Sequence, residues 1–227
     1  MIDEKQKGII ELLTTKATLK QDIADYSEEI MSLFNATMRD ELAQLEGQIK
    51  DSRVRMRMEE KGGHEFRVYI GSDVLVFQLH RNVFRLPEDN SMWKTPYLSD
   101  DESKGYFGII NIYNFLAESF EQNRSNDPGY LIGRVFLNKD QNFMVEGKGQ
   151  LGFLFRELAK SKISEAIIRR ILQISMAFAI DFDLITPPYT MVQQVSVGQI
   201  QMISSNLSVA TGKRLGFKFS SENDDVF

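Results

Sequence analysis

The segment EFRVYIGSDVLVFQL, residues 65–79, decides the fold class. From Phe66 to Ile70, apolar and polar residues alternate, which is the period of a strand with one buried face. A second apolar segment, Val74–Leu79, follows after a short turn that contains Gly71. Two such segments joined by a short glycine-bearing connection are typical of an antiparallel hairpin. The stretch therefore predicts two paired strands of an antiparallel sheet.

The rest of the chain adds more strands and two further helices to this hairpin. Apolar residues recur at helical spacing from Ser161 until Pro187 and the proline after it forbid a helix. Ser196 is placed to cap another helix, followed by a last strand over 214–219. The layout predicts an α+β fold, a curved antiparallel sheet with helices packed on one face, within a single domain over 51–227 that ends in a disordered tail near 220–227. The other expected strands are Arg53–Met58, Tyr106–Tyr113, Tyr130–Leu137, Asn142–Glu146 and Gln150–Phe155.

A long amphipathic helix, coiled-coil-like, is expected over residues 1–50 as an arm in front of this domain. Between Glu4 and Lys50 there is no proline, and apolar residues follow a heptad pattern. A continuous helix of this length measures about 65–70 Å, more than the roughly 30–40 Å that a domain of this size shelters. Pairing with a second copy is the simplest cover for its apolar stripe; the alternative is a helix broken near Asn35 and folded back. The predicted partner-binding residues of the stripe are Leu19, Ile23, Tyr26, Ile30 and Leu33.

Composition and charge exclude several classes of protein. The net charge of −5 argues against a dedicated nucleic-acid-binding protein. The chain has no cysteine, so disulfides, thiol nucleophiles and cysteine-ligated metals are excluded. The N-terminal MIDEKQKGIIELL lacks the apolar core of a signal peptide, and Arg169 and Arg170 interrupt the apolar stretch Ile163–Ile185. We therefore expect a cytoplasmic protein with no membrane span.

Arginines alternate with apolar residues in RVRMRM, residues 53–58. On a strand, Arg53, Arg55 and Arg57 form one charged row, and Arg67 joins it if the first two strands pair across the Gly62-Gly63 turn. One interpretation is a solvated face whose arginines pair with nearby glutamates. The other is a platform for an anionic ligand or partner, because guanidinium groups bind carboxylate and phosphate oxygens in pairs.

A second glycine-rich motif, GKGQLG over residues 147–152, matches the spacing of a dinucleotide-binding loop. We interpret it as a hairpin turn, because QLGFLF after it has the pattern of a returning strand. If the loop instead holds a phosphate, Lys148 is its cation.

Three further features have two interpretations each. Asp181 and Asp183 end the expected buried helix, where carboxylates can hold a hard cation but more often face solvent. Trp93, in a polar loop, is either an internal anchor or a partner-binding aromatic. We assign His80 to a polar strand face, because a catalytic triad or a two-histidine metal site needs residues from distant positions.

No residue set in the chain forms a catalytic motif. We therefore expect a non-catalytic binding or regulatory module without a cofactor, homodimeric through the N-terminal helix and holding a ligand or a protein partner. Two alternatives stay open: an enzyme that acts on a phosphorylated or nucleotide substrate with a divalent ion, and a structural subunit whose arm binds a different chain.

Overall fold

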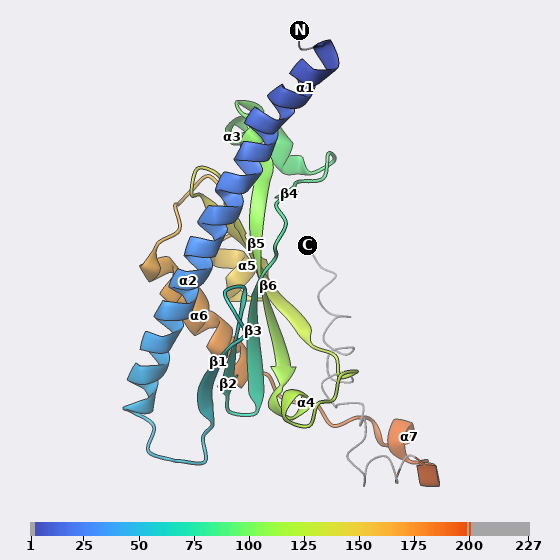
Figure 1. Ribbon diagram of the computed structural model, residues 1–227. Helices are drawn as coiled ribbons and strands as arrows, with labels where there is room; N and C mark the ends of the chain where they lie inside the picture. The colour runs from blue at the N-terminus through green and yellow to red at the C-terminus, as the bar shows by residue number, and fades with distance from the viewer. Residues whose placement is uncertain (1–2, 199, 201–227) are drawn as a thin grey trace.

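A single long helix opens the structure, a computed structural model that describes residues 3–198 and 200 (Figure 1). It consists of α1, Glu4–Leu12, a π-helical turn η1, Leu13–Ala17, and α2, Thr18–Glu46. The helix begins with a capping box, in which the backbone N–H of Gln6 donates to Asp3 Oδ1 over 2.7 Å and Gln6 Oε1 accepts from the Asp3 backbone. The predicted long helix is confirmed, and the alternative of a break near Asn35 is wrong, because α2 is unbroken there.

Threonine hydroxyls stabilise the π turn. The Thr18 hydroxyl donates to the Leu13 carbonyl five residues back, over 3.2 Å, and Thr15 donates to the Glu11 carbonyl over 2.7 Å. A π turn widens the helix by one residue, which rotates the side chains before it by about 100° relative to those after it. The apolar residues of α1 therefore do not continue the buried stripe of α2 in a straight line.

The sheet is antiparallel throughout, which confirms the predicted α+β class. Its strands lie in the order β1-β2-β3-β5-β6-β7, and β4, Phe84–Arg85, pairs with the start of β5. The hairpin at 65–79 was predicted nearly residue for residue, whereas the first strand starts at Met56 and leaves Arg53 and Arg55 in the preceding loop. The strand bounds are β1 Met56–Glu60, β2 Glu65–Ile70, β3 Asp73–Leu79, β5 Tyr106–Leu116, β6 Tyr130–Leu137 and β7 Phe143–Gly147.

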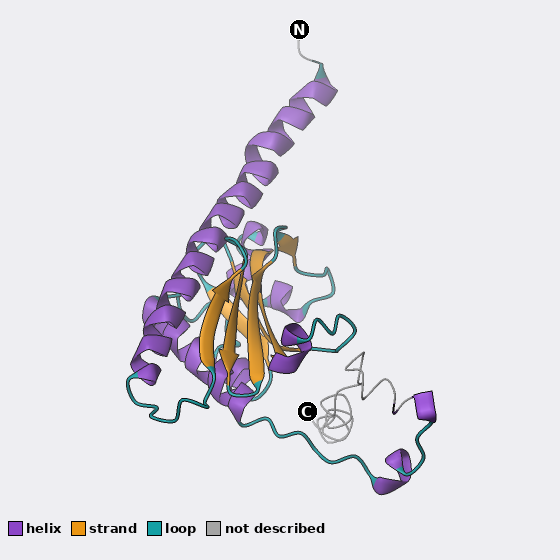
Figure 2. Ribbon diagram, turned by 60° about the horizontal axis from the view of Figure 1, so that its bottom comes forward, coloured by secondary structure: helices purple, strands orange, loops and turns teal. Residues whose placement is uncertain are grey.

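Helices α2 and α6, Glu165–Ile180, pack together on one face of the sheet, and the N-terminal part of the long helix extends beyond the sheet (Figure 2). Phe34 of α2 lies over Phe77 of β3, with ring centroids 6.2 Å apart, and Phe66 stacks on Phe77 at 4.7 Å. All three rings are fully buried. The middle of the long helix is thus part of the core rather than a separate arm.

The predicted strand at Gln150–Phe155 is wrong, because that segment forms the short helix α5, Gln150–Leu154. Leu151 is fully buried and packs against Gly147, where a Cβ would stand 2.9 Å from the Leu151 Cβ. Gly149 takes a φ of 54°, which lets the chain turn from strand to helix without a hairpin.

Shorter helices and one boundary shift complete the described fold. The N-cap of α6 is Ser164, three residues later than the sequence suggested. Most of the helix expected after Ser196, the strand expected at 214–219 and the tail near 220–227 lie outside the described residues. The short helices are η2 Ser91–Lys94, α3 Pro96–Ser99, η3 Glu102–Gly105, α4 Ala117–Glu121 and α7 Tyr189–Val192.

Among the helices of residues 3–198 and 200, none combines the length and the apolar character that crossing a bilayer requires.

Candidate functional site

A row of polar side chains crosses the sheet on the face that α2 and α6 leave uncovered. Strand register places its members opposite one another on five successive strands. Because side chains alternate between faces, all of them lie on the side away from the helices. The row consists of Glu65 on β2, Gln78 on β3, Asn111 on β5, Arg134 on β6 and Glu146 on β7.

The two ends of this row are ion-paired, whereas its middle is not. Glu65 accepts from Arg67 Nε over 2.8 Å, and Arg134 pairs with Glu146 across the strands. Asn111 is 9% exposed, and its side chain has no hydrogen-bond partner among the described residues. The amide atoms of Asn111 are not sealed off from solvent, so at the centre of this sheet face they can exchange water for a ligand.

A groove of about 480 Å³ opens above Asn111. Its floor is formed by β5 and β6, and the segment that follows β3 forms one wall. Aromatic and hydrogen-bonding side chains share its lining, including His80, Phe84, Asn111, Tyr113, Arg134 and Phe136. Its size is within the range of small-molecule sites, about 300–1,000 Å³.

Trp93 supports the wall of this groove from behind. Its indole N–H donates to the Pro87 carbonyl over 2.7 Å, and the guanidinium of Arg85 lies 4.6 Å from its ring centroid. The ring also covers Gly105 so closely that a Cβ there would stand 2.2 Å from it. This geometry favours the internal-anchor interpretation of Trp93 over partner binding.

Asn138, which is fully buried, ties the same loops to the end of β6. Its side-chain amide donates to the Tyr97 hydroxyl over 3.0 Å and to the Lys104 carbonyl over 3.2 Å. Beside it, Lys139 Nζ donates to Asp101 Oδ2 over 2.5 Å, which lowers the pKa of Asp101 to about 2. These contacts hold the loop over residues 97–104 against the residues that follow β6.

The predicted arginine row is a set of ion pairs. Register places Arg57 opposite Tyr69 and Glu59 opposite Arg67 on the face away from the helices, so the expectation that Arg67 joins Arg57 is confirmed. Arg57 Nη1 lies 2.6 Å from Glu59 and its guanidinium 3.7 Å from the Tyr69 ring centroid. Arg55 pairs with Glu121 at 2.9 Å. The other pairs are Arg67 with Glu65 at 2.7 Å and Arg53 with Asp51 at 2.7 Å.

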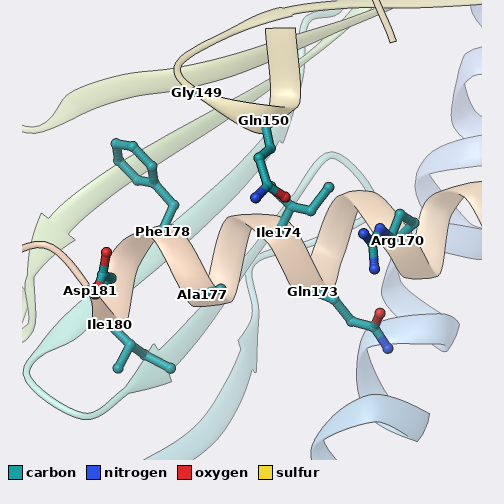
Figure 3. A pocket seen from close by; sticks show the side chains of 9 residues that line it. All are labelled: Gly149, Gln150, Arg170, Gln173, Ile174, Ala177, Phe178, Ile180 and Asp181. Atoms are coloured by element: carbon teal, nitrogen blue, oxygen red, sulfur yellow. The ribbon is translucent and has the colours of Figure 1, made fainter. Parts of the chain in front are cut away.

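Lys148 does not join these arginines. It follows β7 at one edge of the sheet, whereas Arg55 and Arg57 lie at the opposite edge, on or before β1. Next to Lys148, the outer face of α6 bounds a second cavity, of about 760 Å³, between Gln150 and Phe178 (Figure 3). The structure therefore separates the residues of the predicted anion site into two places.

Asp181 is the C-cap residue of α6, and Asp183 lies exposed two residues later. In the described part of the chain, no three His, Cys, Asp or Glu side chains are grouped as a metal site requires.

The predicted partner-binding stripe of the long helix is mostly covered by its own subunit. Ile23 is fully buried and Ile30 is 7% exposed, so neither is available to a second chain. Tyr26 and Leu33 pack against the core from its edge, and burial raises the pKa of Tyr26 to about 12. Leu19 is half-buried where the helix meets the body.

The apolar residues that stay exposed lie further toward the N-terminus. They occupy α1 and the first residue of the π turn, where the helix extends beyond the sheet (Figure 2). Their exposed fractions run from 46% to 59%. These residues are Ile9, Ile10, Leu12 and Leu13.

Sequence reasoning missed the groove although part of its signal is visible. Asn111 lies in the strand sequence YFGIINIYNF, residues 106–115. Apart from Asn114, all the other residues of this segment are apolar, aromatic or glycine. An amide among apolar residues of a strand indicates a polar site, but the pattern does not say what lies above it.

Comparison of the chain with protein-family models, with curated proteins and with solved structures finds no match.

Proposed function

We propose that this chain is a non-catalytic cytoplasmic binding module that forms a homodimer through the projecting part of its N-terminal helix. The observation that carries the proposal is the exposed apolar group Ile9, Ile10, Leu12 and Leu13 on a helix whose remaining apolar stripe is mostly covered by its own subunit. Such a group on a projecting helix is typical of an interaction surface.

The charge of the projecting segment is nearly balanced, which is compatible with a second copy as the partner. Lys5 and Lys7 offset Asp3 and Glu4, and Glu11 precedes Lys16 and Lys20. A segment without a strong excess of one sign does not repel its own copy and does not require an oppositely charged partner.

The energetics predict a weak dimer. Each apolar side chain contributes at most about 1.5–3 kcal/mol on complete burial, and these four are already partly covered. Association costs roughly 4–15 kcal/mol in lost freedom of motion. The two quantities are of similar size, so only a small surplus stabilises the dimer, and we expect a dissociation constant on the order of hundreds of micromolar to millimolar.

The long helix also supports a regulatory role. On one face of β5, Gly108 contacts α2, and on the other face Asn111 lines the groove. A ligand that repositions β5 therefore acts on the strand that carries the helix, and through it on the relative placement of the two subunits.

Light scattering on the full chain across a concentration series tests the dimer. We expect the mass to rise from that of one chain toward two between about 10 μM and 2 mM, a range that includes the expected constant. Ile9→Glu with Leu12→Glu should hold the protein as a monomer over this range. Gln44→Glu, on an exposed position of α2, is the matched control and should dimerise normally. A monomer at every concentration would overturn the proposal and favour a subunit whose arm binds a different chain.

A further inference from the structure

We propose that the groove above Asn111 binds a planar heteroaromatic molecule of nucleobase type, of about nucleoside size. The proposal rests on the binding role proposed above but not on the dimer. Its starting point is an amide that is nine-tenths buried, lines the groove and has no partner among the described residues.

The hydrogen-bonding groups determine what the ligand must offer. An asparagine amide presents one acceptor oxygen and two N–H donors side by side. A nucleobase edge presents the complementary donor and acceptor pair, which is why asparagine recognises adenine through two bonds at once. A purely apolar ligand leaves the Asn111 amide unsatisfied, and a simple anion uses its N–H groups but not its oxygen.

Two neighbours add donors at the side of the groove. His80 Nδ1 accepts from the Asn82 backbone N–H over 3.1 Å, so the proton of the neutral ring resides on Nε2. The Tyr113 hydroxyl, which can donate or accept, has no hydrogen bond to any described residue. Both residues line the groove.

The apolar part of the lining suits a flat ring. Phe84 is 39% exposed and lies edge-on to His80, with ring centroids 4.6 Å apart. Phe136 is buried beside Phe107, at 5.8 Å, and the Arg134 guanidinium lies over its ring at 5.3 Å, so it forms part of the floor and not a free stacking face. The exposed ring of Phe84 can stack on a nucleobase, at about 1–3 kcal/mol for each base.

The charges favour a nucleoside over a nucleotide. Arg85 and Arg134 are the cations of the lining, and both already have carboxylate partners. Arg85 pairs with Glu102 at 3.2 Å, and Arg134 pairs with Glu146, which itself lines the groove. A phosphate has to displace one of these carboxylates, whereas an uncharged ligand does not.

Isothermal titration calorimetry on the full chain tests the site, with adenosine, guanosine, cytidine and uridine as probes and adenosine monophosphate as the charged comparison. At least one nucleoside should bind, and no more weakly than its monophosphate. Asn111→Leu should weaken binding at least tenfold and, because the Asn111 side chain makes no hydrogen bond to a described residue, should not lower the melting temperature. Gln78→Ala, the next member of the polar row but outside the groove, is the control and should bind normally.

Three results decide against the proposal. Absence of heat with every nucleoside at millimolar concentration overturns it, as does full binding by Asn111→Leu. Tighter binding of the monophosphate overturns the assignment of an uncharged ligand. These failures are distinct from that of the dimer, because a monomer that binds a nucleoside refutes the dimer and leaves the groove assignment intact.

Discussion

Ser27 of α2 lies against Gly108 of β5 with no room for a side chain between them. A Cβ on Gly108 would stand 1.9 Å from Ser27 Oγ and 2.8 Å from Ser27 Cβ. The Ser27 hydroxyl donates to the Ile23 carbonyl over 2.6 Å, which keeps its oxygen on this side of the helix. At Gly108, the long helix therefore packs directly against the backbone of β5.

Gly108→Ala tests this close contact between α2 and β5. The added methyl group has to push α2 away from the sheet, and overpacking of this kind costs about 1–3 kcal/mol. Urea denaturation measures the change in the free energy of unfolding. Gly63→Ala is the matched control, since an added Cβ at 63 meets no described atom within 4 Å. Equal stability of the two variants would contradict the close contact.

The parts of the fold that follow from local patterns were predictable from the sequence. In β2, alternation determines which side chains face the core, and the short turn after it predicts the antiparallel pairing with β3. The long helix follows from its spacing as well. What covers the apolar stripe of this helix does not follow from the sequence. Whether Ile23 packs against a second copy or against its own sheet depends on contacts between residues that are distant in the chain.

The sequence was misleading where two structures share one pattern. QLGFLF alternates like a strand, yet Gly147 and Gly149 allow a tight turn into α5 with Leu151 buried beneath it. The groove likewise depends on Asn111 and Arg134 meeting across β5 and β6, and on Trp93 holding a loop beside them. Such juxtapositions are properties of the assembled sheet, and no single segment contains them.

Glu41 and Arg169 join the two helices that cover the sheet. Glu41, with a side chain 8% exposed, accepts from Arg169 and from Gln173 Nε2 over 2.9 Å. Arg169 also pairs with Glu165 at 2.9 Å, and these carboxylates raise its pKa, the Glu41 hydrogen bond most of all. Arg169→Leu leaves a buried carboxylate without its cation, so we expect it to lower the melting temperature more than Glu41→Leu does.

The double variant of Glu41 and Arg169 supplies the check on this pair. Its loss in melting temperature should be smaller than the sum of the two single losses, because it leaves no unpaired charge behind. Additive losses, measured by calorimetry, would mean that the two side chains do not interact across the helices.

Asp101 makes stability depend on pH in the acid range. Its ordinary pKa of 3.8 falls to about 2 in the folded protein, through hydrogen bonds from Lys139 and from Ser103. A folded-state pKa below the unfolded one contributes stability that is complete above about pH 4 and is lost as the pH falls toward 2. The urea midpoint of Asp101→Asn should therefore lie below that of the native chain at pH 6, and this difference should shrink between pH 4 and pH 2. A difference that stays constant over this range would rule out the carboxylate as its source.

Arg57 and Arg67 provide the last prediction, on the face for which the sequence left open either a solvated set of ion pairs or a platform for an anionic ligand. Both guanidinium groups are held by carboxylates, and each also lies over an aromatic ring, at 3.7 Å from Tyr69 and 4.4 Å from Phe120. We expect Arg57→Gln or Arg67→Gln to change the free energy of unfolding by less than about 1 kcal/mol, as for other partly exposed ion pairs.

Inorganic phosphate separates a set of ion pairs from an anion site at these arginines. Since each arginine already has a carboxylate partner, millimolar phosphate should raise the melting temperature of the native chain no more than it raises that of Arg67→Gln. The same small rise is expected for Arg53→Gln, in which the change lies in the loop before β1. A phosphate-dependent rise that disappears in Arg67→Gln alone would instead assign an anion-binding site to this face, because ligand binding to the folded state stabilises it by mass action.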